Sequence, residues 1–239
     1  MTSTTALIFG NNKYANEILS NVKDKYQSVK IYSLKGEDMY DEEQKIEYFD
    51  LSDEWMEIKE YVDTENSIAF CVLEDTAENI FLTISLRENF SDLIIMAIAS
   101  NKESANKLKM AGANKVIPLV ETTADIITNM LEKPISNKIL NDILYGESDL
   151  KIAQIKISED SHVKDEHVSS IDWSRYNGII ILSIMHEDMK SDFIYSSRAK
   201  HHVINSGDIL VVVGYENDIQ EFEKKIGSKR YVNWSHWGW

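Results

Sequence analysis

The stretch Leu93-Ile-Ile-Met-Ala-Ile-Ala99 is apolar at every position and does not alternate with polar residues. A strand with one solvated face alternates between apolar and polar side chains, whereas a strand covered on both faces is apolar throughout. Coverage of both faces is typical of α/β proteins, in which helices connect parallel strands. This stretch therefore predicts a buried strand of a parallel sheet with helices on both sides.

Short apolar runs alternate with helical patterns on either side of this strand. The first run, Ala6–Phe9, ends at Gly10, and a helical pattern containing Tyr14 and Ile18 follows. Further strands are expected at 29–34, 46–49, 67–73 and 115–118, and further helices at 53–62, where Asp53 is the expected cap, and at 76–88, 102–111 and 122–132. This order predicts an α/β fold for residues 1–134: a Rossmann-like, doubly wound parallel sheet.

A different pattern follows Pro134. A linking helix is expected within 135–148, and apolar residues then mark strands near 150–157, 179–185 and 209–213. Gly207-Asp208 predicts a turn, and Ile219, Phe222 and Ile226 recur at the spacing of a closing helix. Residues 149–239 are therefore expected to form a small α+β C-terminal lobe that ends in an aromatic tail.

Composition excludes several classes of protein. The 239 residues include 43% hydrophobic ones, enough for a sizeable core, and no apolar run approaches the ~18 residues of a membrane span. With 25 basic and 40 acidic residues the net charge is −15, which disfavours sequence-independent nucleic-acid binding. Cys71 is the single cysteine, which excludes an internal disulfide, and its place in the apolar run 67–73 predicts a buried thiol. No signal peptide is evident, and a cytoplasmic location is expected.

Two surface segments have open interpretations. On one interpretation an acidic run binds Ca²⁺ or Mg²⁺, and on the other it is a solvated loop. The spacing of its acidic residues matches no calcium-binding loop and so favours the solvated loop. The run contains Glu37, Asp38, Asp41, Glu42 and Glu43. The tail places Trp234, Trp237 and Trp239 close together, which predicts packing against a neighbouring lobe or subunit unless the end is frayed.

The turn Phe9-Gly10-Asn11-Asn12-Lys13-Tyr14-Ala15 joins the first strand to the first helix. A dinucleotide-binding turn needs a second glycine where Asn12 stands, and an acidic residue where the second strand ends near Ser33. Both features are missing, although the helix N-terminus and Lys13 still favour an anion. The sequence predicts a vestigial or altered pocket. The six histidines form no i, i+4 metal pair, and no catalytic motif is evident.

Two sequence motifs occur along the chain in the order that is typical of one protein family. Asp75 and Asn79 begin a helix that ends in Arg87, and Ala111-Gly-Ala-Asn-Lys-Val-Ile117 closes the unit. Gly207-Asp-Ile-Leu-Val-Val-Val-Gly214 follows in the second lobe. Together they resemble the regulator-of-potassium-conductance (RCK) domain, also called the TrkA N-terminal domain, with its matching C-terminal domain. The resemblance covers residues 5–227 and departs from the family at Asn12 and Ser33.

The resemblance implies a regulatory module that gates a potassium channel or transporter and has no catalytic activity. Its membrane partner is a separate subunit or a covalently linked pore domain, and its ligand is a nucleotide (NAD, ATP or ADP) or Ca²⁺. By position, the pocket comprises Gly10, Asn11, Asn12, Lys13, Ser33, Lys35, Asp50, Glu74, Asp75 and Asn79.

The family also pairs into homodimers and higher rings through helices after the sheet. The residues expected at this interface are Ile126, Ile127, Met130, Leu131, Ile139, Leu140 and Ile143. The alternative is that they bridge the two lobes of one chain. Two other functions stay open: an NAD(P)-dependent oxidoreductase, which needs an intact phosphate turn and a proton donor, and a Rossmann-like scaffold without ligand that acts by oligomerising.

Overall fold

The computed structural model describes residues 4–35, 46–52, 55–60, 62–144, 149–186 and 190–231. These residues belong to two units: one ends at Thr128 and the other begins at Asn129. The first contains β1 (Thr5–Phe9), α1 (Lys13–Val22), β2 (Ser28–Leu34), β3 (Ile46–Phe49), α2 (Met56–Lys59), β4 (Ser67–Cys71), α3 (Thr76–Asn89), β5 (Ile94–Ala99), α4 (Lys102–Met110) and β6 (Lys115–Pro118). Helix α5 (Leu119–Glu132) spans the division. The acidic run 37–43, Asp53 and the three tail tryptophans lie outside the described residues.

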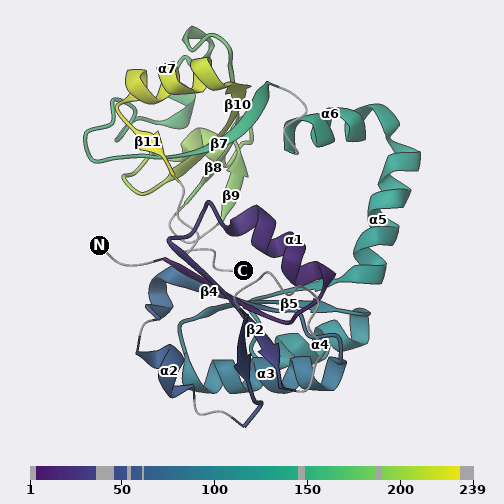
Figure 1. The fold of residues 1–239 in the computed structure, drawn as a ribbon. Helices are drawn as coiled ribbons and strands as arrows, with labels where there is room; N and C mark the ends of the chain where they lie inside the picture. The colour runs from purple at the N-terminus through teal and green to yellow at the C-terminus, as the bar shows by residue number, and fades with distance from the viewer. Residues whose placement is uncertain are drawn as a thin grey trace. The chain divides into compact units, whose positions relative to one another are not determined.

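The first unit holds a six-stranded sheet in the order β3-β2-β1-β4-β5-β6 (Figure 1). All neighbouring strands pair in parallel. The chain therefore winds outward from β1 in one direction and from β4 in the other. This arrangement confirms the predicted doubly wound parallel sheet.

Apolar layers cover both faces of the central strand β1, whose residues are all buried. Phe9 packs with Leu82 and Leu86 of α3, whereas the neighbouring Ile8 packs with Ala15 of α1. Successive side chains of a strand point to opposite faces, so α1 and α3 lie on opposite sides of the sheet, as Figure 1 shows. Cys71 is buried in this core, as predicted, and burial raises the pKa of its thiol to about 12.

The helices differ from the predicted ranges by more than one residue at three places. Among the described residues of the expected helix 53–62, only the four of α2 are α-helical, and Trp55 before them has a left-handed backbone (φ 55°) through which no helix continues. The Trp55 ring packs 5.6 Å from the ring of Phe9 and its Nε1 donates to Ser85 Oγ at 2.7 Å. Helix α5 begins three residues early, directly after β6, and α6 (Pro134–Leu144) begins with a proline, a residue that the first turn of a helix tolerates.

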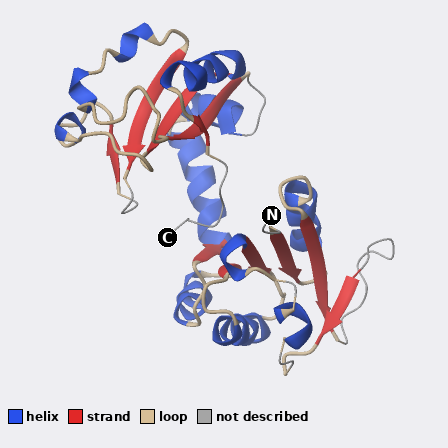
Figure 2. Cartoon of the chain, turned by 90° about the vertical axis from the view of Figure 1, so that its left-hand side faces the viewer, coloured by secondary structure: helices blue, strands red, loops and turns tan. Residues whose placement is uncertain are grey.

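The elements of the second unit are α6 (Pro134–Leu144), β7 (Leu150–Lys156), β8 (Ile179–Met185), β9 (Ser191–Phe193), β10 (Ile209–Tyr215), α7 (Glu216–Ile226) and β11 (Lys229–Arg230). Its strands form an antiparallel sheet of five in the order β11-β7-β10-β8-β9. Figure 2 colours all strands of the chain red and all helices blue. Ile219, Phe222 and Ile226 of α7 are buried in the core of this unit, as the sequence predicts. The predicted α+β lobe is confirmed. Within the described residues of both units, no helix has the length and apolar character needed to cross a membrane.

Arg87 holds the end of α3 against the loop between α4 and β6. Its guanidinium donates to Gly112 O at 3.0 Å, to Asn114 Oδ1 at 2.6 Å and to Phe90 O at 3.2 Å. Gly112 has a positive φ of 106°, and a Cβ there would come 2.6 Å from Arg87 Cγ. The Arg-ending helix and the Ala-Gly-Ala-Asn segment of the sequence motif are therefore two halves of one contact.

We expect Arg87→Met to destabilise the chain by about 2–4 kcal/mol, because the apolar stem stays while several carbonyl acceptors lose a charged donor. Arg87→Lys should also destabilise it, since one ammonium cannot span the acceptors that the planar guanidinium reaches. Urea unfolding followed by circular dichroism measures both. The control is Lys107→Met, which removes an exposed ion pair with Glu103 and should change stability by less than about 0.5 kcal/mol. Equal stability of Arg87→Met and wild type would contradict this role.

Candidate functional site

The predicted pocket residues lie around the carboxyl ends of the parallel strands, where the strand order reverses between β1 and β4. Ligands of open α/β sheets bind at this edge. Gly10 follows β1 with a φ of 137°, and a Cβ on it would approach Val72 O to 2.9 Å. Only glycine fits this close approach, so the turn brings the backbone of β1 against that of β4.

Asn12 begins helix α1 and is nearly buried, at 6% exposure. Its Oδ1 accepts from Tyr14 N at 3.0 Å and Ala15 N at 3.1 Å, and its Nδ2 donates to Val72 O at 2.7 Å. A helix N-terminus binds phosphate through such unpaired amides. Here Asn12, which stands in place of the glycine, accepts hydrogen bonds from two of these amides itself. The altered turn therefore leaves fewer amides for a phosphate.

Of the residues predicted from the second and third strands, Ser33 lies next to this turn, because Gly10 N donates to the carbonyl of the preceding residue, Tyr32, at 2.8 Å. Lys35 and Asp50 follow β2 and β3, farther along the same edge of the sheet. Ser33 is fully buried inside β2, whereas Lys13 and Lys35 are exposed. Asp50 accepts from the backbone and the hydroxyl of Ser52, and these hydrogen bonds, followed by the charge of Lys35, hold the pKa of the carboxyl below its usual value. Lys35 lines a hollow of about 350 Å³ together with Tyr32, Tyr48, Phe49, Trp55, Met56, Glu57 and Ile58.

Two of the three residues predicted after β4 are engaged in the fold. Asp75 caps α3 by accepting from Ala77 N at 2.8 Å and Glu78 N at 2.9 Å. Buried Asn79 donates through Nδ2 to Cys71 O at 3.2 Å and to Ile98 O at 3.1 Å, so it joins the ends of β4 and β5. Glu74 is exposed and is the charged residue of the adjoining pocket.

That pocket, of about 170 Å³, lies between the ends of β4 and β5. Glu74 and Asn79 line it together with Tyr14, Ser100 and Ser104, which the sequence analysis missed. The signal for the two serines was the Ser-Asn pair directly after β5, since Asn101 caps α4 through Ser104 N at 2.9 Å. A pocket for a whole dinucleotide usually exceeds ~300 Å³, so this one suits a smaller ligand or part of a larger one.

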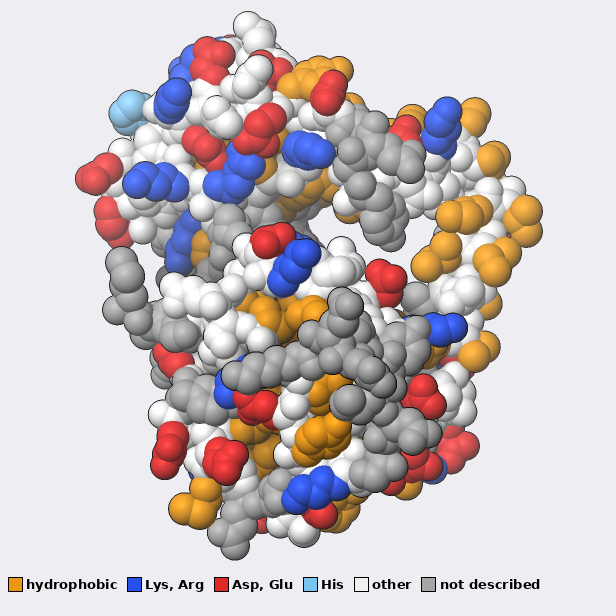
Figure 3. All heavy atoms as spheres, viewed as in Figure 1, with side chains coloured by type: hydrophobic (Ala, Val, Ile, Leu, Met, Phe, Trp, Pro, Cys, Tyr) orange, Lys and Arg blue, Asp and Glu red, His pale blue; other side chains and the backbone are white. Residues whose placement is uncertain are grey.

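Large apolar side chains are exposed along α5 and α6, and Figure 3 shows them gathered over these helices. Neither helix has a buried residue. Six of the seven residues predicted at an interface are 44–78% exposed, and Ile143 is half-buried. The six are Ile126, Ile127, Met130, Leu131, Ile139 and Leu140. We refer to them as the α5–α6 face.

Family models match both units. Residues 48–119 match the TrkA-N domain, and residues 152–227 match the TrkA-C domain. The first match begins within β3, after the β1–α1–β2 segment in which Asn12 and Ser33 depart from the family pattern.

Known proteins show the same relationship. The chain is 24% identical over 163 residues to probable potassium channel protein 2 of Methanocaldococcus jannaschii, covering 66% of this chain and 46% of that protein. It is 23% identical over 161 residues to potassium channel protein 1 of the same organism, with 67% and 45% covered. The chain thus spans less than half the length of these curated relatives.

Among solved structures, the human SLO3 gating ring has the same fold, with a TM-score of 0.60 at 12% identity over 91% of this chain and 45% of that one. The element order, the two family matches and the relatives agree with one another. The chain carries a TrkA-N domain followed by a TrkA-C domain: it belongs to the RCK proteins and is a distant homologue of potassium channel proteins.

Proposed function

We propose that this chain is a regulatory module that controls a potassium channel or transporter through a ligand-dependent change in a dimer or ring of its copies. The observation that carries the proposal is the TrkA-N domain followed by a TrkA-C domain in a chain related to potassium channel proteins. In this proposal it performs no catalysis and acts at the cytoplasmic face of the membrane. The pore belongs to a separate subunit or to the same polypeptide.

The α5–α6 face supports pairing with a second copy. An apolar stripe along two successive helices is larger than the scattered apolar residues that a monomer usually exposes. A two-fold axis would pack the α5–α6 face of one copy against the same face of the other. The hydrophobic effect then favours the dimer without any charged contact.

The pocket between β4 and β5 is physically connected to this face. Leu119, the first residue of α5, lines the pocket, and Glu121 Oε1 of α5 accepts from Lys102 N at 2.9 Å. A ligand beside Glu74 and Ser104 would therefore contact the N-terminus of α5, the helix that carries part of the α5–α6 face. Ligand binding shifts the assembly only by its differential affinity for two arrangements of this helix.

The ligand, in this proposal, does not place a diphosphate on the amides of α1. Asn12 Oδ1 already accepts from Tyr14 N and Ala15 N. A nicotinamide oxidoreductase would need those amides for its cofactor, so the capped turn argues against that alternative. A scaffold without any ligand would show the dimer and no response to the candidate ligands.

We expect the chain to be a dimer or a multiple of one, and a double variant of the α5–α6 face, Ile127→Lys with Ile139→Lys, to sediment as a monomer. Two charges in each copy of the face would have to lose water on pairing, which opposes association. Analytical ultracentrifugation measures the mass of both forms. Met110→Lys is the control, because Met110 of α4 is 88% exposed and lies outside the face. A monomeric wild type, or a dimeric double variant, would contradict pairing through this face.

We expect Asn12→Gly to bind ADP and NAD about tenfold more tightly than wild type, because it frees two amides for a charged acceptor. Isothermal titration measures the change. Asn101→Gly is the matched control: it removes the side-chain cap of α4 but leaves the turn after β1 intact. The account fails if wild type binds these nucleotides tightly and Asn12→Gly weakens the binding.

Potassium uptake tests the function itself. Cells of the source organism that lack this chain should take up potassium, or its tracer rubidium, at an altered rate. Wild type and Met110→Lys should restore the rate, and the double variant of the α5–α6 face should not. Unchanged uptake in the cells that lack the chain would refute the proposed function.

A further inference from the structure

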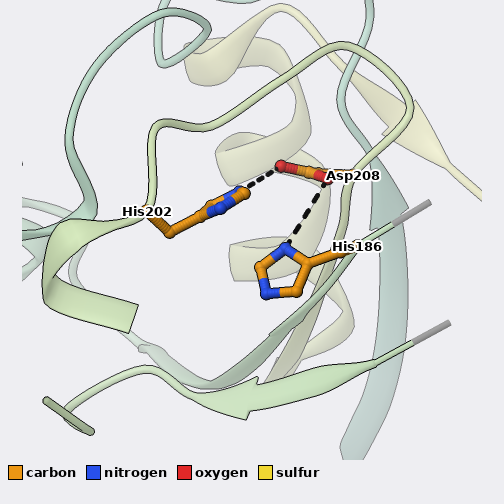
Figure 4. A group of neighbouring side chains, drawn as sticks. All are labelled: His186, His202 and Asp208. Carbon is orange, nitrogen blue, oxygen red and sulfur yellow. Dashed lines mark hydrogen bonds and ion pairs between the residues drawn. The ribbon is translucent and has the colours of Figure 1, made fainter. Parts of the chain in front are cut away.

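Three side chains from separate segments of the second unit converge (Figure 4). His186 directly follows β8, His202 follows the short 3-10 helix Ala199–His201, and Asp208 precedes β10. Figure 4 shows both imidazole rings turned toward the carboxylate of Asp208. Within the described ranges, this is the one group of three or more His, Cys, Asp or Glu residues whose ligand atoms lie within 4.8 Å of one another.

One nitrogen of each imidazole faces one oxygen of the same buried carboxylate. His202 Nε2 lies 2.6 Å from Asp208 Oδ2, and His186 Nδ1 lies 3.9 Å from Asp208 Oδ1, beyond hydrogen-bond distance. The centroids of the two imidazole rings are 4.0 Å apart. Asp208 is only 2% exposed, and its Oδ2 also accepts from Asn205 N at 2.9 Å, so the carboxylate is held in place.

His186 has the hydrogen-bond arrangement that is typical of a metal-binding histidine. Its Nε2 lies 3.3 Å from Asp192 Oδ2, and because a carboxylate only accepts, Nε2 carries the proton of the neutral ring. The lone pair is then on Nδ1, which is buried and has no hydrogen-bond partner among the described residues. A histidine that binds a metal through one nitrogen commonly donates from the other to a carboxylate, which fixes its tautomer.

We propose that His186 Nδ1, His202 Nε2 and the Asp208 carboxylate bind one divalent transition-metal ion of the zinc class. Two imidazoles and one carboxylate are a common ligand set for Zn²⁺, with water or a further ligand in the fourth position. Ca²⁺ and Mg²⁺ prefer oxygen ligands and are not expected here. The site goes beyond the proposed function, since it gives the TrkA-C domain a ligand of its own and does not depend on the pocket near β4.

The ligand atoms, all within 4.8 Å of one another, lie near the spacing that an ion would require. In a tetrahedral zinc site, ligand atoms are separated by about 3.4 Å, which follows from metal–ligand bonds of about 2.1 Å. The present separations of 2.6 Å and 3.9 Å lie on either side of this value. The ion would replace the proton shared by His202 and Asp208 and draw His186 Nδ1 inward, so it would tie the loop of His202 to the ends of β8 and β10.

The test is Zn²⁺ titration of the full chain without a histidine tag, in competition with a chromophoric chelator. Wild type should bind one ion per chain, and His186→Gln and His202→Gln should each weaken binding by about a hundredfold or more. Asp192→Asn should weaken it about tenfold, as expected for a residue that orients a ligand. The matched control is His201→Gln, because His201 is exposed and adjacent in sequence to His202 but outside the cluster.

Asp208 is left unchanged in this series because it also holds the turn at Asn205, and its loss would disturb the fold. His186→Gln and His202→Gln are checked for wild-type circular dichroism in the presence of chelator. Co²⁺ gives a second readout, since wild type should show the strong visible absorption of four-coordinate Co²⁺ and His186→Gln should not. Absence of saturable Zn²⁺ binding, or equal binding by His186→Gln, His202→Gln and wild type, would overturn the proposal.

Discussion

Burial of β1 on both faces is the constraint on which the first unit depends. A strand with no solvated face needs helices above and below it, and parallel neighbours connected by those helices place every strand end at one edge. At that edge the chain must turn sharply from β1 into α1 while β4 passes close by, and Gly10 fits because a Cβ would collide with Val72. The location of the candidate pocket follows from this packing.

Asn12 shows how one residue changes what such an edge binds. With glycine at this position, the backbone amides of α1 would face a ligand; with asparagine, Oδ1 occupies two of them and Nδ2 ties the turn to Val72 O. The turn is therefore stabilised by its own side chain instead of by a phosphate. At this edge of the sheet, the pocket of about 170 Å³ between the ends of β4 and β5 stays accessible to a ligand, and Leu119 of α5 lines it.

The sequence predicted what depends on local pattern and missed what depends on tertiary contacts. Apolar runs and helical spacing located the parallel strands and the closing helix with Ile219 and Phe222. The loss of the glycine at Asn12 was visible in sequence, but its acceptor on β4 was not, because that contact forms only when distant strands pair. Nor did any spacing reveal the cluster of His186 and His202, since both lie in irregular segments that the antiparallel sheet brings together.

The central claim is that a second copy of the chain covers the α5–α6 face. The most direct measurement is amide hydrogen exchange of the full chain over a range of protein concentrations, read out for the segment 119–144. The account predicts that exchange in this segment slows as concentration rises, while exchange in the exposed part of α4 near Met110 stays constant. Exchange in α5 and α6 that is independent of concentration, in a chain with the mass of a monomer, would contradict it.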